Sequence, residues 1–208
     1  ILLVKEITFM FIGRKTELKQ LNEQYNSNKF EFAVIYGRRR IGKTSLIQEF
    51  IKNKEALFFT GLETTQKQNL INLSQVILQS NSENISFNSF QAALENIFEQ
   101  TNKKRIIFII DEYPYLANSY PAISSILQLL IDKNKENSKL FLILCGSSLS
   151  FMEEQVLGYQ SPLYGRRTSK YKIKPFSFFE TCDYYKTFSY EEKALIYGLT
   201  SGIPLYLS

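Results

Sequence analysis

The chain has 208 residues, of which 44% are hydrophobic and 22% charged, so it can form one α/β core and the beginning of a second small unit, and a disordered chain is excluded. It contains no histidine and only two cysteines, Cys145 and Cys182. These counts exclude a Ser-His-Asp triad, a Cys-His dyad and zinc sites built from histidine or several cysteines. The formal net charge of +5 is mild and does not by itself indicate nucleic-acid binding.

The apolar runs of the sequence have the length of strands. The runs at 106–110 and 140–145 fall far short of the roughly 18 to 20 residues that a membrane-spanning helix needs. The apolar stretch 1–12 is interrupted by Lys5 and Glu6, and no small-residue cleavage site follows it, which argues against a signal peptide. Two unpaired cysteines suit a reducing compartment. We therefore expect a cytoplasmic protein that does not associate with membranes, and its first residue, an isoleucine, suggests a piece of a longer chain.

Strand and helix patterns alternate along the sequence. Apolar, β-prone segments predict strands at 30–36, 56–60, 105–110, 140–145 and, more weakly, 171–173. Helical spacing of apolar residues predicts helices at 18–25, 44–51, 65–79, 87–100, 123–131, 179–185 and 190–199, with Ser86 as the N-cap of the fourth. The segment 105–110 is apolar on both faces, as in a parallel sheet covered by helices on both sides. The pattern predicts a three-layer α/β fold with a parallel sheet.

A phosphate-binding loop is the strongest motif in the chain. Residues 37–44 match G-x-x-x-x-G-K-[ST] at every fixed position, between a predicted strand and a predicted helix. Lys43 is expected to contact the β- and γ-phosphates and to support catalysis, and Thr44 to offer its hydroxyl to Mg²⁺. The nucleotide-binding candidates of this segment are Gly37, Arg38, Arg39, Arg40, Ile41, Gly42, Lys43, Thr44 and Ser45. The three arginines occupy variable positions, where solvated side chains that raise the local potential explain them without a catalytic role.

An acidic pair, Asp111-Glu112, ends the buried strand predicted at 105–110. In P-loop enzymes an aspartate at this place holds Mg²⁺, and the next acid can polarise the attacking water. We assign Asp111 to the metal and Glu112 to general-base catalysis, although a surface turn also explains two acids at a strand end. No Asn-Lys-x-Asp motif for guanine follows a strand, because residues 102–105 precede one and lack the acid, so ATP is favoured over GTP.

Several further segments match one family in the same order. They are 11–14 with Glu17 and Leu18, 36–44, 111–116, 145–148, 165–166, 175–176 and 202–204. Together they resemble the archaeal-type ATPase family, which belongs to the AAA+/STAND branch of the P-loop ATPases. The resemblance implies the sheet order 5-1-4-3-2, then a helical lid and, in longer members, a winged helix and a variable C-terminal domain. It implies a P-loop ATPase core at 1–175 and the start of the lid at 176–208.

The resemblance also implies further site residues. Residues 11–14, among them Gly13 and Arg14, would lie along the adenine and ribose side of the pocket. Gly202 and Pro204 would approach the nucleotide from the lid, although an ordinary helix-ending glycine followed by proline explains them equally well.

Two positions near the ends of the last strands have catalytic counterparts in ring-forming ATPases. Ser147, with Ser148 beside it, follows the fourth strand, where a polar sensor residue positions the attacking water, although a turn and a helix cap explain both serines as well. Arg166, with Arg167 beside it, precedes the fifth strand, near the place of an arginine finger. Surface charge or an intramolecular ion pair is the simpler explanation of these arginines.

The stretch 159–186 mixes cations with aromatic rings. Such mixing suits a nucleic-acid surface, because cations contact phosphates while rings stack on bases. It equally suits a strand and a lid helix with aromatic side chains inside and lysines outside.

The residues together favour a Mg²⁺-dependent ATP-binding and ATP-hydrolysing domain that couples its nucleotide state to a C-terminal output domain. The main alternative is a nucleotide-dependent switch or scaffold with negligible turnover. A small-molecule P-loop kinase would need an acceptor pocket that the sequence does not reveal. The expected ligands are ATP and Mg²⁺, and the partners left open are a second copy, another protein and nucleic acid.

Overall fold

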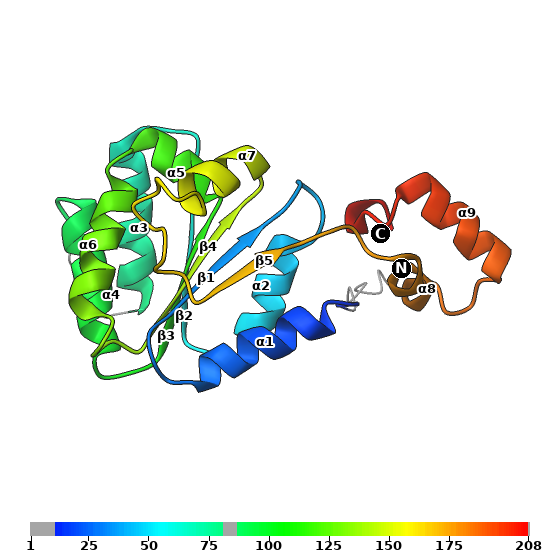
Figure 1. Ribbon diagram of the computed structural model, residues 1–208, viewed down its shortest axis with the longest axis horizontal. Helices are drawn as coiled ribbons and strands as arrows, with labels where there is room; N and C mark the ends of the chain where they lie inside the picture. The colour runs from blue at the N-terminus through cyan, green and yellow to red at the C-terminus, as the bar shows by residue number, and fades with distance from the viewer. Residues whose placement is uncertain (1–10, 81–86, 208) are drawn as a thin grey trace, which may run out of the picture.

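Five parallel strands form one sheet in the order β2-β3-β4-β1-β5 in the computed structural model, which describes residues 11–80 and 87–207 (Figure 1). The strands are β1 (Glu31–Tyr36), β2 (Ala56–Thr60), β3 (Ile106–Asp111), β4 (Leu140–Gly146) and β5 (Ser169–Lys172). The predicted α/β class and the order 5-1-4-3-2 are confirmed. The fifth strand begins two residues earlier than predicted and ends one residue earlier.

The helices follow the predicted alternation with strands. They are α1 (Lys15–Asn26), α2 (Lys43–Ile51), α3 (Gln66–Ser80), α4 (Phe90–Thr101), α5 (Tyr113–Ser119), α6 (Ile123–Asn134), α7 (Leu149–Phe151), α8 (Phe178–Tyr184) and α9 (Tyr190–Thr200), with a π-helical turn at Met152–Val156 and a 3₁₀ turn at Pro204–Tyr206. The sequence patterns missed α5, α7 and the π-helical turn, which are too short for a clear apolar period.

The N-cap prediction for the fourth predicted helix was wrong. Ser86 lies outside the described residues, and α4 begins after Ser89, whose hydroxyl accepts a hydrogen bond from the backbone N–H of Ala92 at 3.1 Å. The reason is local, because a serine caps a helix only when its oxygen reaches an N–H of the first turn.

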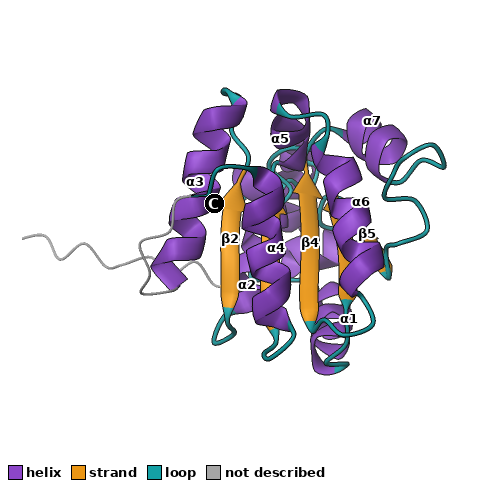
Figure 2. Cartoon of the chain, turned by 90° about the vertical axis from the view of Figure 1, so that its left-hand side faces the viewer, coloured by secondary structure: helices purple, strands orange, loops and turns teal. Residues whose placement is uncertain are grey.

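Helices cover both faces of the sheet, and each face forms its own apolar core. In Figure 2, α3, α4 and α6 lie in front of the strands, where Phe108 and Leu142 belong to the core between sheet and helices. Ile109 and Ile143 point to the opposite face and pack with the core that includes residues of α1 and α2. Every residue of β3 and β4 is buried, which explains why their sequences are apolar without alternation.

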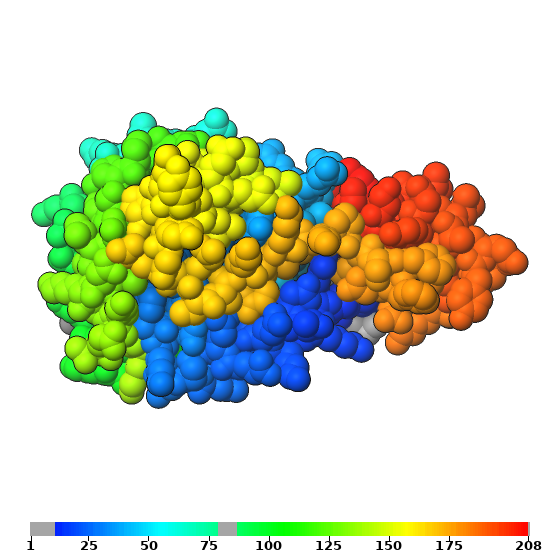
Figure 3. Space-filling model, viewed as in Figure 1, coloured from blue at the N-terminus to red at the C-terminus, as the bar shows by residue number. Residues whose placement is uncertain are grey.

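The segment that follows β5 leaves the sheet and forms a separate protrusion. We call residues 176–207 the lid segment; it contains α8 and α9, which contact each other through the rings of Phe178 and Tyr197 at 5.6 Å. Figures 1 and 3 show it beyond the end of the sheet at which α1 begins. No helix in the described part of the chain is long and apolar enough to cross a bilayer.

Candidate functional site

The phosphate-loop motif lies between β1 and α2, as the sequence predicted. Gly37 leaves no room for a side chain, since a Cβ atom there would lie 2.4 Å from the backbone oxygen of Ile173. Gly42 has a φ of +83° and is the N-cap of α2, a left-handed conformation that glycine adopts without strain. Arg40 also has a positive φ, of 68°. The chain thus turns tightly around the N-terminus of α2, where N–H groups and the helix dipole favour an anion.

Lys43, the lysine of the motif, is buried and folds back over the loop that precedes it. Its Nζ donates hydrogen bonds to the backbone oxygens of Gly37 and Arg38, both at 3.0 Å. The ammonium group is therefore held against the inner side of the loop, where phosphate oxygens would meet it.

Two oxygen ligands suitable for a magnesium ion meet beside the loop. The Thr44 hydroxyl donates to Asp111 Oδ2 at 3.0 Å, and Asp111 Oδ1 accepts from the backbone N–H of Glu112 at 3.0 Å. Mg²⁺ is bound in such sites by one or two protein oxygens together with phosphates and waters. The residues present fit this ion, which Thr44 and Asp111 would hold.

Glu112 is the N-cap of α5 and carries the second carboxylate of the pair. Its backbone is left-handed, with φ 49° and ψ 46°, a conformation that a non-glycine residue adopts at a cost and that recurs at functional sites. Glu112 Oε2 accepts hydrogen bonds from Ser147 Oγ at 2.9 Å and from the Ser147 backbone N–H at 3.3 Å. Ser147 directly follows β4, so the structure brings the candidate sensor and the candidate base together.

A buried thiol lies beneath the acidic pair. Burial raises the pKa of Cys145 well above its usual value, and the neighbouring Asp111 raises it further. Cys145 is therefore a protonated, inert side chain of β4, and its position adds no nucleophile to the site.

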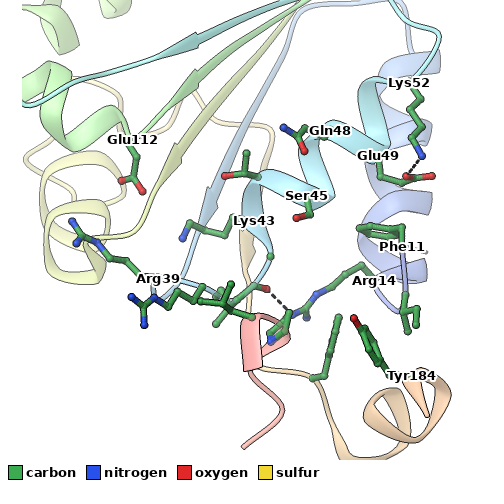
Figure 4. Close-up of a pocket in the computed structure, with 18 residues that line it drawn as sticks. Phe11, Arg14, Arg39, Lys43, Ser45, Gln48, Glu49, Lys52, Glu112 and Tyr184 are labelled. Carbon is green, nitrogen blue, oxygen red and sulfur yellow. Dashed lines mark hydrogen bonds and ion pairs between the residues drawn. The ribbon is translucent and has the colours of Figure 1, made fainter. Parts of the chain in front are cut away.

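A cavity of about 640 Å³ opens above the loop and α2. One end holds Lys43, Thr44 and Glu112, and the other is lined by apolar and aromatic side chains (Figure 4). Its lining residues are Phe11, Ile12, Arg14, Arg39, Arg40, Ile41, Gly42, Lys43, Thr44, Ser45, Gln48, Glu49, Lys52, Glu112, Phe176, Tyr184, Pro204 and Leu205. A charged end and a ring-lined end match a ligand with a polyphosphate and a flat base.

Arg14 lies at the junction of the loop, β5 and the lid segment. Its guanidinium donates to the backbone oxygens of Ile41, at 3.3 Å, and of Lys174, and it lies 4.8 Å from the ring centre of Phe176. Burial lowers the pKa of Arg14, while Glu17 and Glu180 raise it, and the group stays charged. Arg14 lines the cavity, and Figure 4 shows its side chain reaching toward the loop.

The remaining candidates, Gly202 and Pro204 on the lid side and Gly13 on the adenine side, have different surroundings. Pro204 lines the cavity and lies 3.7 Å from where a Cβ of Gly42 would be. Gly202 lies outside the lining and is closely packed, since a Cβ there would lie 2.1 Å from the oxygen of Phe176. Gly13 is also outside it and faces Phe176 and Glu180, each 3.0 Å from the position of a Cβ.

Arg166 is not brought into the site. Its Nε and Nη2 donate to the two carboxylate oxygens of Asp132 at 2.8 and 2.5 Å, and its Nη1 donates to the oxygens of Pro162 and Tyr164. Asp132 belongs to α6, on the face of the sheet opposite α2. The arrangement is the intramolecular ion pair that the sequence left open as the simpler explanation.

Several lining residues were not predicted from the sequence. Gln48, Glu49 and Lys52 continue the face of α2 that begins at Thr44 and Ser45, so helical spacing from the motif could have found them. The other missed residues are Phe176, Tyr184 and Leu205, which no local pattern marks, because they reach the cavity only through the placement of the lid segment.

The basic aromatic stretch divides by face. Tyr171 and Phe176 are buried, whereas Lys170, Lys172 and Lys174 are exposed. This distribution matches the strand-and-lid explanation over 170–176, whereas the rings of Tyr159, Tyr164 and Phe179, elsewhere in the stretch, are exposed.

A family model described as an ATPase domain predominantly from Archaea matches residues 11–208. The chain belongs to this family. This ATPase domain is 40% identical over 198 residues to an uncharacterized protein of Methanocaldococcus jannaschii, and the match covers 95% of the chain but 43% of that relative. The chain therefore spans less than half the length of this relative.

Solved structures share the fold of the ATPase domain. A Walker-type ATPase of Pyrococcus abyssi is 19% identical with a TM-score of 0.71, over 95% of this chain and 65% of that one. A signal transduction ATPase with numerous domains (STAND) and a tetratricopeptide repeat sensor, from Pyrococcus horikoshii, is 23% identical with a TM-score of 0.60, over 96% of this chain and 29% of that one. At these identities the likeness concerns the fold.

Proposed function

We propose that this ATPase domain binds ATP with Mg²⁺ and hydrolyses it to ADP and phosphate. The observation that carries the proposal is a cavity with Lys43, Thr44 and Glu112 at one end and aromatic rings at the other. Asp111 is held at the charged end by its hydrogen bond with Thr44. Membership in an archaeal ATPase family supports it. When bound, Mg²⁺ would neutralise charge on the phosphates, held by Thr44 and Asp111.

In the proposed reaction, Lys43 binds the β- and γ-phosphates and Glu112 serves as the general base. A water oxygen bonds to the γ-phosphorus while the bond from that phosphorus to the β–γ bridging oxygen breaks. Glu112 accepts the proton of the water and returns it to solvent after phosphate and ADP leave. Ser147 orients the carboxylate through its hydroxyl and N–H.

The test compares the wild-type chain with Lys43→Ala and Glu112→Gln. Thermal stabilisation by ATP with Mg²⁺ and release of phosphate are measured on each. We expect Lys43→Ala to abolish the stabilisation, and Glu112→Gln to keep it while slowing phosphate release by about 10²-fold or more. Glu63→Gln, at an exposed position, is the matched control and should behave as wild type. Unchanged phosphate release in Glu112→Gln would refute the base assignment.

We further propose that the lid segment transmits the nucleotide state. It contacts the loop at Pro204, packed near Gly42, and at Tyr206, whose hydroxyl accepts a hydrogen bond from Arg40 at 3.4 Å. A ligand that shifts the loop therefore displaces the lid segment, on which a following output domain would depend. Amide exchange of 176–207 that is the same with ADP and with a non-hydrolysable ATP analogue would contradict this coupling.

A nucleotide-dependent switch with negligible turnover is the second candidate. The pairing of Arg166 with Asp132 favours it, because this arginine is then not available to a neighbouring subunit's nucleotide. ATP-dependent stabilisation that Lys43→Ala abolishes, without phosphate release from the wild-type chain, is the result that would select the switch.

A further inference from the structure

The loop of this ATPase domain carries three consecutive arginines whose charges are not matched by acids. Arg38, Arg39 and Arg40 are all exposed, and none forms an ion pair within the described part of the chain. Of these three arginines, Arg39 and Arg40 line the cavity and Arg38 does not. Arg40 contacts the lid through Tyr206, which leaves Arg39 as the lining arginine on the catalytic side.

Arg39 is next to the position expected for the γ-phosphate. Lys43 Nζ contacts the backbone oxygen of Arg38 at 3.0 Å, and Arg39 is the next residue of the loop. Because the lysine of such a loop reaches the β- and γ-phosphates, Arg39 begins at the γ-phosphate end. Figure 4 shows its side chain on the side of the loop that faces Glu112, away from Phe11 and the ring-lined end.

The Arg39 guanidinium has a neutral partner that also belongs to the catalytic side. It donates a hydrogen bond to the hydroxyl of Tyr115, on α5. The backbone N–H of Tyr115 in turn bonds the carbonyl of Glu112 at 3.0 Å, in the first turn of that helix. A neutral hydroxyl competes poorly with phosphate oxygens for a guanidinium, because phosphate carries the opposite charge and its oxygens can accept two N–H groups of the fork at once.

We propose that Arg39 is a catalytic residue that acts within its own chain, an inference that rests on the proposed ATP hydrolysis. Its guanidinium moves from the Tyr115 hydroxyl to the γ-phosphate oxygens and stabilises the negative charge that spreads over them as the β–γ bridging bond breaks. The planar fork of arginine suits two oxygens of one phosphate. Arg39 thus takes the role that Arg166, bound to Asp132, does not fill.

The test uses Arg39→Ala and Arg39→Lys, with Lys103→Ala as a control that removes one exposed charge in the loop between α4 and β3. Phosphate release is measured together with the thermal shift caused by MgADP alone and by MgADP with aluminium fluoride, a mimic of the transferring phosphoryl group. We expect Arg39→Ala to keep the MgADP shift, to lose the additional shift from aluminium fluoride and to lower kcat by ~10²-fold or more. Arg39→Lys keeps the charge without the planar fork, so its kcat and its additional aluminium fluoride shift should lie between those of wild type and Arg39→Ala.

The outcomes separate this inference from the proposed function. If MgATP and MgADP cause no thermal shift in the wild-type chain, or cause the same shift in Lys43→Ala, both the proposed function and the Arg39 role are refuted. If Arg39→Ala keeps the additional thermal shift from aluminium fluoride and a kcat within about threefold of wild type, only the Arg39 role is refuted. If Arg39→Ala melts early without nucleotide, Arg39→Gln, which keeps a donor for Tyr115 but loses the charge, gives the deciding comparison.

Discussion

Removal of the Arg14 side chain is expected to loosen the junction between core and lid. The guanidinium makes two hydrogen bonds to backbone oxygens, those of Ile41 and Lys174, and stacks on Phe176. Charge-assisted bonds contribute roughly 1.5–3 kcal/mol each and the ring contact about 1 kcal/mol. The variant no longer bears the cost of burying a cation, so the net loss for Arg14→Ala is about 3 kcal/mol. For a chain of this size that lowers Tm by roughly 6–12 °C.

Thermal unfolding without nucleotide measures this effect, and two controls separate its causes. Arg14 has a left-handed backbone with φ 55°, so Arg14→Gly removes the same contacts while it relieves roughly 1 kcal/mol of strain. It should therefore melt above Arg14→Ala. Lys19→Ala, on the same helix and exposed, should change Tm by less than about 2 °C. An Arg14→Ala variant that melts within 2 °C of wild type would show that the junction does not depend on these bonds.

Two further predictions concern the loop and the Arg166 ion pair. Gly37→Ala places a methyl group 2.4 Å from the backbone oxygen of Ile173, so it should cost about 1–3 kcal/mol of stability and weaken ATP binding. Gly198→Ala is the control, because a Cβ there meets nothing within 4 Å, and it should be at least as stable as wild type. Calorimetry with and without ATP measures both variants, and equal Tm values for the two would contradict the close packing at Gly37. Arg166 holds the pKa of Asp132 below its ordinary value, first through the hydrogen bond, so the pair stabilises the fold above the unfolded pKa of about 3.9 and this stabilisation disappears as pH falls through the folded pKa. Asp132→Asn should therefore lower the free energy of unfolding at pH 7 by less than about 1 kcal/mol, because solvent screens this partly exposed pair, and Tm should fall slightly. In strong acid the variant should match wild type, and a Tm deficit that persists there would exclude an electrostatic origin.

Local patterns predicted the parts of the fold that depend on neighbours in the sequence. The strands β3 and β4 are buried on both faces, so their sequences are continuous apolar runs that are easy to recognise. The loop before Lys43 was predictable because its glycines and its flanking strand and helix lie within one short segment. The short α5 escaped prediction because seven residues give too little apolar periodicity.

The sequence alone determined the α/β class, the phosphate loop and the acidic pair, since each depends on the order of residue types along a few turns of chain. Only the tertiary structure decided the contacts between distant segments. The packing of the elements hydrogen-bonds Ser147 to Glu112, pairs Arg166 with Asp132, and brings residues of the lid segment to the cavity. Which distant residue a side chain contacts depends on how whole helices and strands pack, and the residue types next to it in the sequence do not determine that packing.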